Sequence, residues 1–288
     1  MNSTPLFSVL MANYNDSKYI DNAIESVKKQ TYSNWEIIIV DDASPDNSID
    51  VYKKYEGDPR IHIYFNEKNY GCGYTKHKCV DLSNGEICGF VDADDAITPD
   101  AIEIMVNEHV KNPDASLIYS YLYFCDKELR VQRISNHQCQ IPRETTYLEY
   151  KNNCVSHFAT FKRILYDKTT GINELFLIAE DLDLYYKLEE VGRLIHIPRP
   201  LYYYRTGNST HISLGEKVQY TLIWCFLAKS DACRRRGVNI EKYSFPYIDE
   251  IISIHVKQAI QNNMNTPDYR IGNFLLKPFR WVKKHFAK

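Results

Sequence analysis

The sequence lacks any run of about 18 apolar residues, the length that a membrane-spanning helix requires. Its first residues carry neither the basic segment nor the apolar core of a secretory signal peptide, so we expect no such peptide before the fold. The eight cysteines include no C-x-x-C pair, which argues against a structural zinc site or a disulfide framework. A reducing compartment suits such scattered thiols, and we therefore expect a cytoplasmic protein.

The sequence also lacks an excess of positive charge. It contains 35 lysines and arginines against 37 aspartates and glutamates, for a net charge of -2. This balance excludes a globally basic nucleic-acid binder, and we expect no nucleic-acid partner. With 288 residues, 44% of them hydrophobic and 25% charged, the chain resembles an ordinary globular protein with one large domain or a main domain and an appendage.

Glycine-rich phosphate loops are missing as well. The nearest candidate, Gly71-Cys72-Gly73, lacks the third glycine of the dinucleotide-binding motif and lies too late in the chain. No G-x-x-x-x-G-K-[ST] segment exists anywhere in the sequence. The sequence therefore argues against a dinucleotide site or a P-loop site as the basis of function.

The first 125 residues alternate between strand and helix patterns, which predicts an α/β fold. The expected strands are residues 6 to 11, 35 to 40, 61 to 65, 87 to 91 and 117 to 124. This order predicts a mostly parallel, nucleotide-binding sheet with helices on both faces. We expect three regions: a nucleotide-sugar-binding subdomain at 1–125, an acceptor-binding region with the catalytic base at 126–212, and a helical extension at 213–288.

Carboxylates follow two of these expected strands directly. Asp41 and Asp42 follow one strand, and Asp92, Asp94 and Asp95 follow another. Each group could simply form a turn or cap the next helix. Because parallel strands bring their carboxyl ends to one edge of a sheet, we expect both groups to line one crevice, where clustered negative charges require a cation or a hydrogen-bonding ligand.

The order of these motifs resembles the family-2 inverting glycosyltransferases of the GT-A fold. The resemblance rests on residues 7 to 15, 30 to 44 and 92 to 95, with Pro99-Asp100 beyond them. It covers residues 6 to about 125 and continues to about 210 through Glu180-Asp181 and the segment 202 to 205. The last 75 or so residues fall outside it.

The resemblance implies a donor site for a nucleoside-diphosphate sugar. In it, Ala12 and Tyr14 would meet the nucleotide base, and Asp42 would accept a hydrogen bond from a base N–H. Asp92 would reach the ribose or the metal, and Asp94 would be the direct ligand of Mn²⁺ or Mg²⁺.

Other positions depart from the family pattern or extend it. Lys76 stands where relatives usually carry an arginine, so a positive charge for a phosphate remains but the guanidinium geometry does not. Arg205 is a candidate for a diphosphate contact. His211 is either a third metal ligand or a surface histidine.

The catalytic base is expected in the pair Glu180-Asp181, at the start of a helix predicted over 180 to 191. The resemblance implies that the second residue, Asp181, is the base, with Glu180 as the other candidate. Acidic residues are also favourable in any first helical turn, so the pair has a purely structural alternative. His157 either lines the acceptor side or is a packed residue.

The activity that the resemblance implies is a metal-dependent transfer, with inversion, of a hexosyl or N-acetylhexosaminyl group from a UDP-sugar. The acceptor would be a hydroxyl of a glycan or lipid-linked acceptor in bacterial surface polysaccharide synthesis. One alternative is a sugar-nucleotide pyrophosphorylase, which normally has a glycine- and arginine-rich loop that this chain lacks after its first strand. Another is a non-catalytic module that binds a nucleotide sugar or a glycan.

The C-terminal segment 269–288 combines six cations with aromatic and aliphatic residues and has no acidic side chain. This composition is typical of a helix lying at a membrane surface, and also of a terminal helix docked with a solvated basic face. We therefore expect either a peripheral contact with an anionic membrane, at the inner face of the plasma membrane, or a terminal helix docked on the protein. The six cations are Arg270, Lys277, Arg280, Lys283, Lys284 and Lys288.

Overall fold

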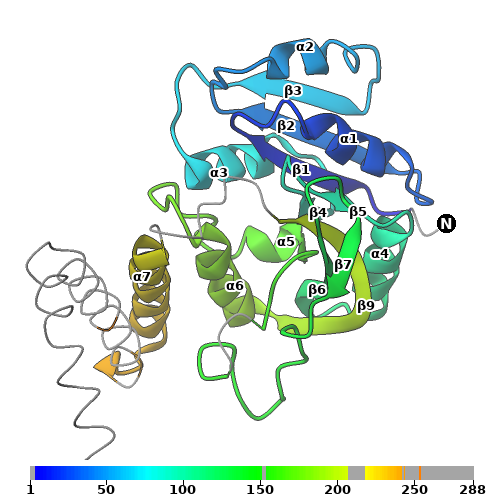
Figure 1. Ribbon diagram of the computed structural model, residues 1–288. Helices are drawn as coiled ribbons and strands as arrows, with labels where there is room; N and C mark the ends of the chain where they lie inside the picture. The colour runs from blue at the N-terminus through cyan, green and yellow to red at the C-terminus, as the bar shows by residue number, and fades with distance from the viewer. Residues whose placement is uncertain (1–3, 151–153, 207–217, 242, 244–252, 254–288) are drawn as a thin grey trace, which may run out of the picture.

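The computed structural model describes residues 4–150, 154–206, 218–241, 243 and 253. Its elements in chain order are β1 (Phe7–Asn13), α1 (Ile20–Lys28), β2 (Trp35–Asp41), α2 (Ser48–Tyr52), β3 (Ile61–Phe65), α3 (Cys72–Leu82), β4 (Ile87–Phe90), β5 (Ala96–Ile97), α4 (Ala101–Lys111), β6 (Ala115–Cys125), β7 (Val131–Ile134), β8 (Thr160–Lys162), α5 (Arg163–Tyr166), α6 (Glu180–Val191), β9 (Arg193–Arg205) and α7 (Val218–Arg236) (Figure 1).

These strands form one nine-stranded sheet in the order β3-β2-β1-β4-β8-β6-β9-β5, with β7 paired to β6. Strands β1 to β4 pair in parallel, and β6 pairs in parallel with β9. Strand β8 lies antiparallel to both β4 and β6, so β4 and β6 point the same way. Six strands therefore share one direction, which confirms the mostly parallel α/β fold, while β5, β7 and β8 run against it.

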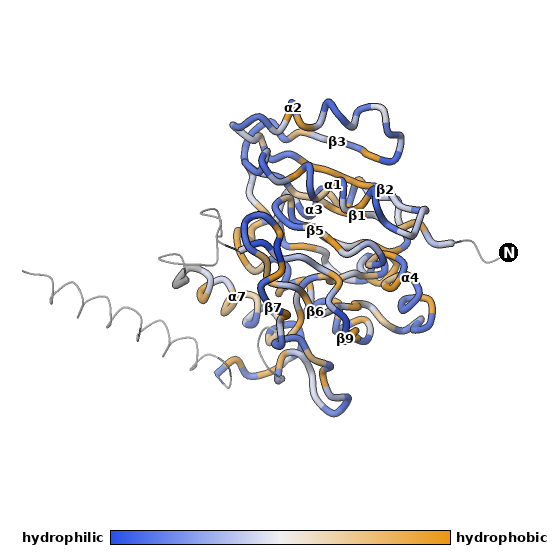
Figure 2. Tube along the Cα trace, turned by 45° about the vertical axis from the view of Figure 1, so that its right-hand side comes forward, coloured by the Kyte–Doolittle hydropathy of each residue, from blue (hydrophilic) through white to orange (hydrophobic). Residues whose placement is uncertain are grey.

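The central strands are largely apolar (Figure 2). Their successive side chains point to opposite faces of the sheet and build one core on each face. On one face, Val9 and Ile37 pack with α1 and α4. On the other, Leu10 and Ile38 pack with α3, α6 and α7. Helices on both faces bury the whole central sheet, as the near-continuous apolar runs of β1 and β2 predict.

The expected strands of the first 125 residues are present, with bounds that differ by up to two residues, and one helix begins later than its pattern predicts. Ser44-Pro45 predicts the start of a helix, but α2 begins only at Ser48. The Ser44 hydroxyl instead accepts a hydrogen bond from the Asn13 side chain at 3.1 Å, which ties this loop to the end of β1. Neither β8 nor the 13-residue β9 was apparent from local pattern, because each depends on pairing with β6 across long stretches of chain.

The expected helical extension begins with α7, which packs beside α6 (Figure 1). The proposed membrane segment 269–288 and His211 lie outside the described residues. Within the described part of the chain, no helix has both the length and the apolar character needed to cross a membrane.

Candidate active site

The ends of the codirectional strands bring the expected donor-site residues to one edge of the sheet. Asn13 at the end of β1 is paired in register with Asp41 at the end of β2. Ala12 is half-buried within β1, and Tyr14 lies just beyond it with 48% of its surface exposed. An exposed aromatic ring at this edge is accessible to a planar ligand.

Asp42 is buried beneath this edge and organises the loop before α3. Its two carboxylate oxygens accept hydrogen bonds from the Asn66 side chain at 2.8 Å, the Tyr70 backbone N–H at 2.9 Å and the Gly71 backbone N–H at 2.8 Å. Three donors on one carboxylate fix the loop firmly. In this arrangement Asp42 holds the loop of residues 66 to 71.

Arg205 holds the acidic loop after β4 in place. Its backbone N–H donates to Asp95 Oδ1 at 2.7 Å, and its Nε donates to the Asp94 carbonyl at 2.5 Å. A further guanidinium N–H donates to the Lys127 carbonyl, and the side chain is 1% exposed. The guanidinium is thus directed at the backbone of Asp94, and it holds the acidic loop after β4 in place through hydrogen bonds.

Lys76 connects the donor-side carboxylates to the expected base. Its Nζ lies 2.8 Å from Glu180 Oε1 and 3.6 Å from Asp92 Oδ1, and its side chain is only 9% exposed. Burial opposes the charged form of this lysine, but Asp92, Cys72 and Glu180 together raise the pKa of Lys76 well above its ordinary value. Lys76 is therefore a buried cation shared between the end of β4 and the start of α6.

The pair Glu180-Asp181 forms the first turn of α6, as the sequence predicts. Burial favours the neutral acid of Glu180, but the ion pair with Lys76 keeps the pKa of Glu180 below its ordinary value. For Asp181, burial and the neighbouring Glu180 charge raise the pKa. The surroundings therefore shift the pKa values of the two carboxylates in opposite directions, downward for Glu180 and upward for Asp181.

His157 lies beside Asp92, which follows the end of β4. Its Nε2 is 3.6 Å from Asp92 Oδ2, and its ring stacks on Tyr202 with centroids 4.8 Å apart. The Tyr204 ring lies behind it, with a centroid separation of 6.0 Å. The structure therefore places His157 in an aromatic wall beside Asp92, where the packed and the site-lining alternatives both apply.

Asp16 is a site residue that the motif analysis missed. One of its carboxylate oxygens is buried without a hydrogen-bond partner. Burial, together with the charges of Asp94 and Asp92, raises the pKa of Asp16 to about 7. Its position after β1 is the signal that could have identified it, because β1 and β4 are neighbours in the sheet.

Carboxylates that repel one another in this way suit a divalent cation, and carboxylate oxygens are the ligands that Mg²⁺ and Mn²⁺ prefer. Asp16, Asp92 and Asp94 supply that chemistry on the donor side. Among the described residues, no three His, Cys, Asp or Glu side chains are already grouped closely enough to hold a metal ion. The donor set fits a cation in chemistry, and a bound diphosphate would have to complete the coordination.

Comparison with known sequences shows the family of the chain. The sequence profile described as glycosyl transferase family 2 matches residues 8–170, more than half of the chain. The chain therefore belongs to glycosyl transferase family 2. It is 31% identical over 241 residues to a chondroitin synthase of Escherichia coli, covering 83% of this chain but only 34% of that synthase. It is also 29% identical over 207 residues to a protein described as a putative colanic acid biosynthesis glycosyl transferase of Escherichia coli, covering 68% of this chain and 74% of that protein.

Solved structures share the GT-A fold. Staphylococcus aureus TarS 1-349 in complex with UDP-GlcNAc superimposes with a TM-score of 0.62 at 20% identity, over 77% of this chain and 66% of that one. A mannosyltransferase from Pyrobaculum calidifontis, in complex with GDP-Man and Mn²⁺, gives a TM-score of 0.60 at 13% identity, over 95% and 84% of the two chains. At these identities the similarity establishes the fold alone, and this fold confirms the expected GT-A-type fold class.

Proposed function

We propose that this chain is an inverting glycosyltransferase that moves a sugar from a nucleoside-diphosphate sugar to an acceptor hydroxyl. The observation that carries the proposal is the position of Lys76, whose ammonium lies within 3.6 Å of Asp92 and 2.8 Å of Glu180. The donor-side strand end and the first turn of α6 therefore share one site. A nucleotide sugar held at the strand ends would present its anomeric carbon toward α6.

Asp181 is the proposed general base. Burial and the neighbouring Glu180 charge raise its pKa, which makes it a better proton acceptor than an ordinary carboxylate. It takes the proton of the acceptor hydroxyl as that oxygen forms a bond to the anomeric carbon. The bond from this carbon to the diphosphate oxygen breaks on the opposite face, the diphosphate leaves with the electron pair, and the configuration inverts.

The remaining donor-side residues bind and orient the substrate. Exposed Tyr14 stacks on the base, with Ala12 beside it, and the loop fixed by Asp42 closes this end of the site. Lys76 supplies positive charge near the diphosphate, and Arg205 keeps the loop of Asp94 in position. His157 faces the acceptor.

Asp94, with Asp92, is proposed to hold Mn²⁺ or Mg²⁺, with His211 as a third ligand. When bound, the cation supplies Lewis-acid stabilisation of the charge on the leaving diphosphate. The mannosyltransferase with GDP-Man and Mn²⁺ supports this assignment by its shared fold.

We propose a UDP-sugar as donor, with a hexosyl or N-acetylhexosaminyl group transferred. TarS in complex with UDP-GlcNAc supports the nucleotide by shared fold, and the chondroitin synthase and colanic acid relatives support bacterial surface polysaccharide synthesis as the setting. A glycan or lipid-linked acceptor fits that setting. We further propose a cytoplasmic location, with residues 269–288 in peripheral contact with an anionic membrane, which co-sedimentation of full-length and truncated protein with anionic liposomes would test.

A donor panel tests the proposed activity. The full chain is incubated with UDP-GlcNAc, UDP-GalNAc, UDP-glucose, UDP-glucuronate and GDP-mannose in the presence of Mn²⁺, and nucleoside diphosphate release is measured with and without oligosaccharide acceptors. We expect release from at least one UDP-sugar. Binding of a UDP-sugar in calorimetry without any release or transfer would instead support a non-catalytic binding module.

A further inference from the structure

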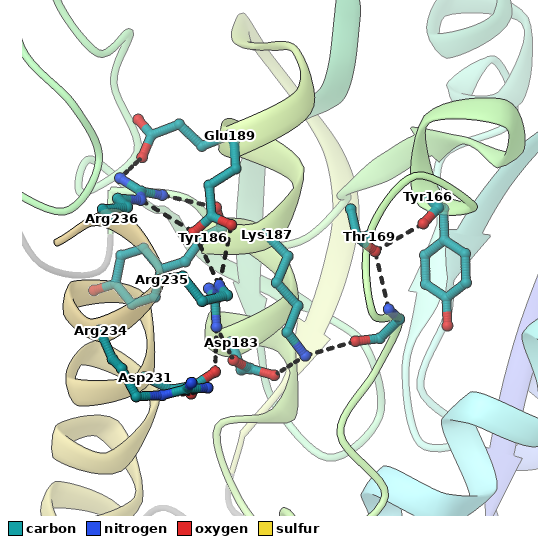
Figure 3. Close-up of polar contacts among 12 residues, drawn as sticks. Tyr166, Thr169, Asp183, Tyr186, Lys187, Glu189, Asp231, Arg234, Arg235 and Arg236 are labelled. Carbon is teal, nitrogen blue, oxygen red and sulfur yellow. Dashed lines mark hydrogen bonds and ion pairs between the residues drawn. The ribbon is translucent and has the colours of Figure 1, made fainter.

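A buried charge network joins α7 to α6, outside the donor site. Asp183, one turn after the first residue of α6, is fully buried. Its carboxylate lies 2.7 Å from Lys187 Nζ on the same helix and 3.6 Å from Arg235 Nη1 on α7 (Figure 3). Burial raises the pKa of Asp183, and both cations oppose that rise. Nearby countercharges favour the ionised form of such a buried carboxylate.

The network extends to the segment that leads into α6. Lys187 Nζ also donates to the Gly171 carbonyl at 2.7 Å. The same segment is anchored further along, where the Gly73 N–H of α3 donates to the Phe176 carbonyl at 3.1 Å. Residues 171 to 179 are therefore held by α6 at Gly171 and by α3 at Phe176 before the chain turns into Glu180 and Asp181.

Arg235 is itself fixed in place by α6 and α7. Its Nε lies 3.0 Å from Glu190 Oε2, and its guanidinium also pairs with Asp231, while only 16% of the side chain is exposed. The next residue, Arg236, donates to the Tyr186 carbonyl at 2.7 Å. At the other end of α7, Trp224 contacts Phe176 with ring centroids 5.1 Å apart. Helix α7 therefore contacts both α6 and the segment before it.

We propose that Arg235 is a positioning residue for Asp181, so that the C-terminal extension forms part of the catalytic unit. The inference rests on the proposed role of Asp181. Without Arg235, Asp183 loses one of its two countercharges at a fully buried position. The Lys187 bridge to Gly171 then weakens, and the first turn of α6 loses its fixed orientation. The ion-pair partners of Arg235 lie on α6 and α7, so its effect on the reaction would pass through α6.

The test compares Arg235→Ala with Arg234→Ala. Both variants remove one arginine from the same turn of α7, but Arg234 is 77% exposed and pairs only with Asp231 among the described residues. We expect Arg235→Ala to lower kcat by about 10-fold, because small displacements of a catalytic group are costly. The Kd for UDP, measured by calorimetry, should stay unchanged. Amide hydrogen exchange should accelerate over residues 171 to 182, and Arg234→Ala should behave like the wild type in all three measurements.

Arg235→Lys keeps the charge with altered geometry and should recover part of kcat, and it provides the same measurements if Arg235→Ala does not fold. Equal kcat and equal exchange in the Arg235 and Arg234 variants, well below their melting temperatures, would overturn the proposal. A parallel loss of UDP affinity would do the same, because it would indicate a general structural defect. If the wild type transfers no sugar, the proposed function fails, while hydrogen exchange over 171 to 182 still decides whether Arg235 holds this segment.

Discussion

Lys76 Nζ lies 2.8 Å from Glu180 Oε1, and the two side chains are 9% and 8% exposed. This ion pair joins α3 to the first turn of α6 across 104 residues of sequence. Its burial means that each charge depends on the other, because an isolated ion in such surroundings is strongly disfavoured. The pair thereby connects the stability of the fold to the geometry of the proposed base.

Lys76→Met should lower the free energy of unfolding by about 3 kcal/mol, because it leaves Glu180 buried without its partner. Adding Glu180→Leu should recover most of this loss, since both charges are then removed. Urea unfolding of the two single variants and the double variant gives the coupling energy. Additive effects of the two substitutions would show that the pair is not coupled.

Gly73→Ala should displace the segment that leads to α6. A methyl group at Gly73 would lie 2.4 Å from the Phe176 carbonyl oxygen and 2.6 Å from the Asn173 carbonyl oxygen, both backbone atoms. We expect a loss of about 2 kcal/mol of stability, as is typical of overpacking, and lower turnover. Gly57→Ala is the control, because nothing lies within 4 Å of the added atom. Equal thermal stability of the two variants would contradict this close packing.

The pH dependence of stability should reveal His109, whose ring lies 2.9 Å from the Thr160 hydroxyl in the core. Burial lowers the pKa of His109 to about 3. The folded pKa is below the unfolded value, so the stability that neutral His109 provides is present above about pH 6.5 and is lost as the pH falls toward 3. Wild-type stability should therefore fall more steeply than that of His109→Gln, by up to about 1.4 kcal/mol per pH unit.

Urea unfolding at pH 7, 5.5 and 4.5 measures this difference in slope. His137→Gln serves as the control for the substitution itself, since His137 is exposed. Parallel pH profiles for the wild type and His109→Gln would show that burial does not keep this histidine neutral.

Asp94→Ala should abolish the Mn²⁺ dependence of UDP binding and leave the fold intact, because a carboxylate at a strand end contributes little to stability. Calorimetric titration of UDP with and without Mn²⁺ measures the effect. Asp100→Ala removes a nearby carboxylate that pairs with Arg199 at 2.8 Å and should bind UDP like the wild type. Unchanged Mn²⁺-dependent affinity in Asp94→Ala would move the cation site elsewhere.

The sequence predicted the elements that depend on local pattern. Apolar runs ending in Asp41 or Asp92 identified β2 and β4, and acidic residues before an apolar stripe identified the start of α6. What local pattern could not reveal depends on long-range pairing: β8 inserts antiparallel between β4 and β6. For the same reason, the contacts of Lys76 with Glu180 and of Arg205 with Asp94 became apparent only from the fold, since they span 104 and 111 residues of sequence.

Turnover of Asp181→Asn tests the central claim most directly. The substitution keeps the size of the side chain and removes the proposed base, so turnover should fall by at least about 10²-fold, the lower end of general-base contributions. The Kd for UDP in the presence of Mn²⁺ should remain close to that of the wild type. Turnover like that of the wild type would contradict the account, and Glu180→Gln, assayed in parallel, would then show whether the base is its neighbour.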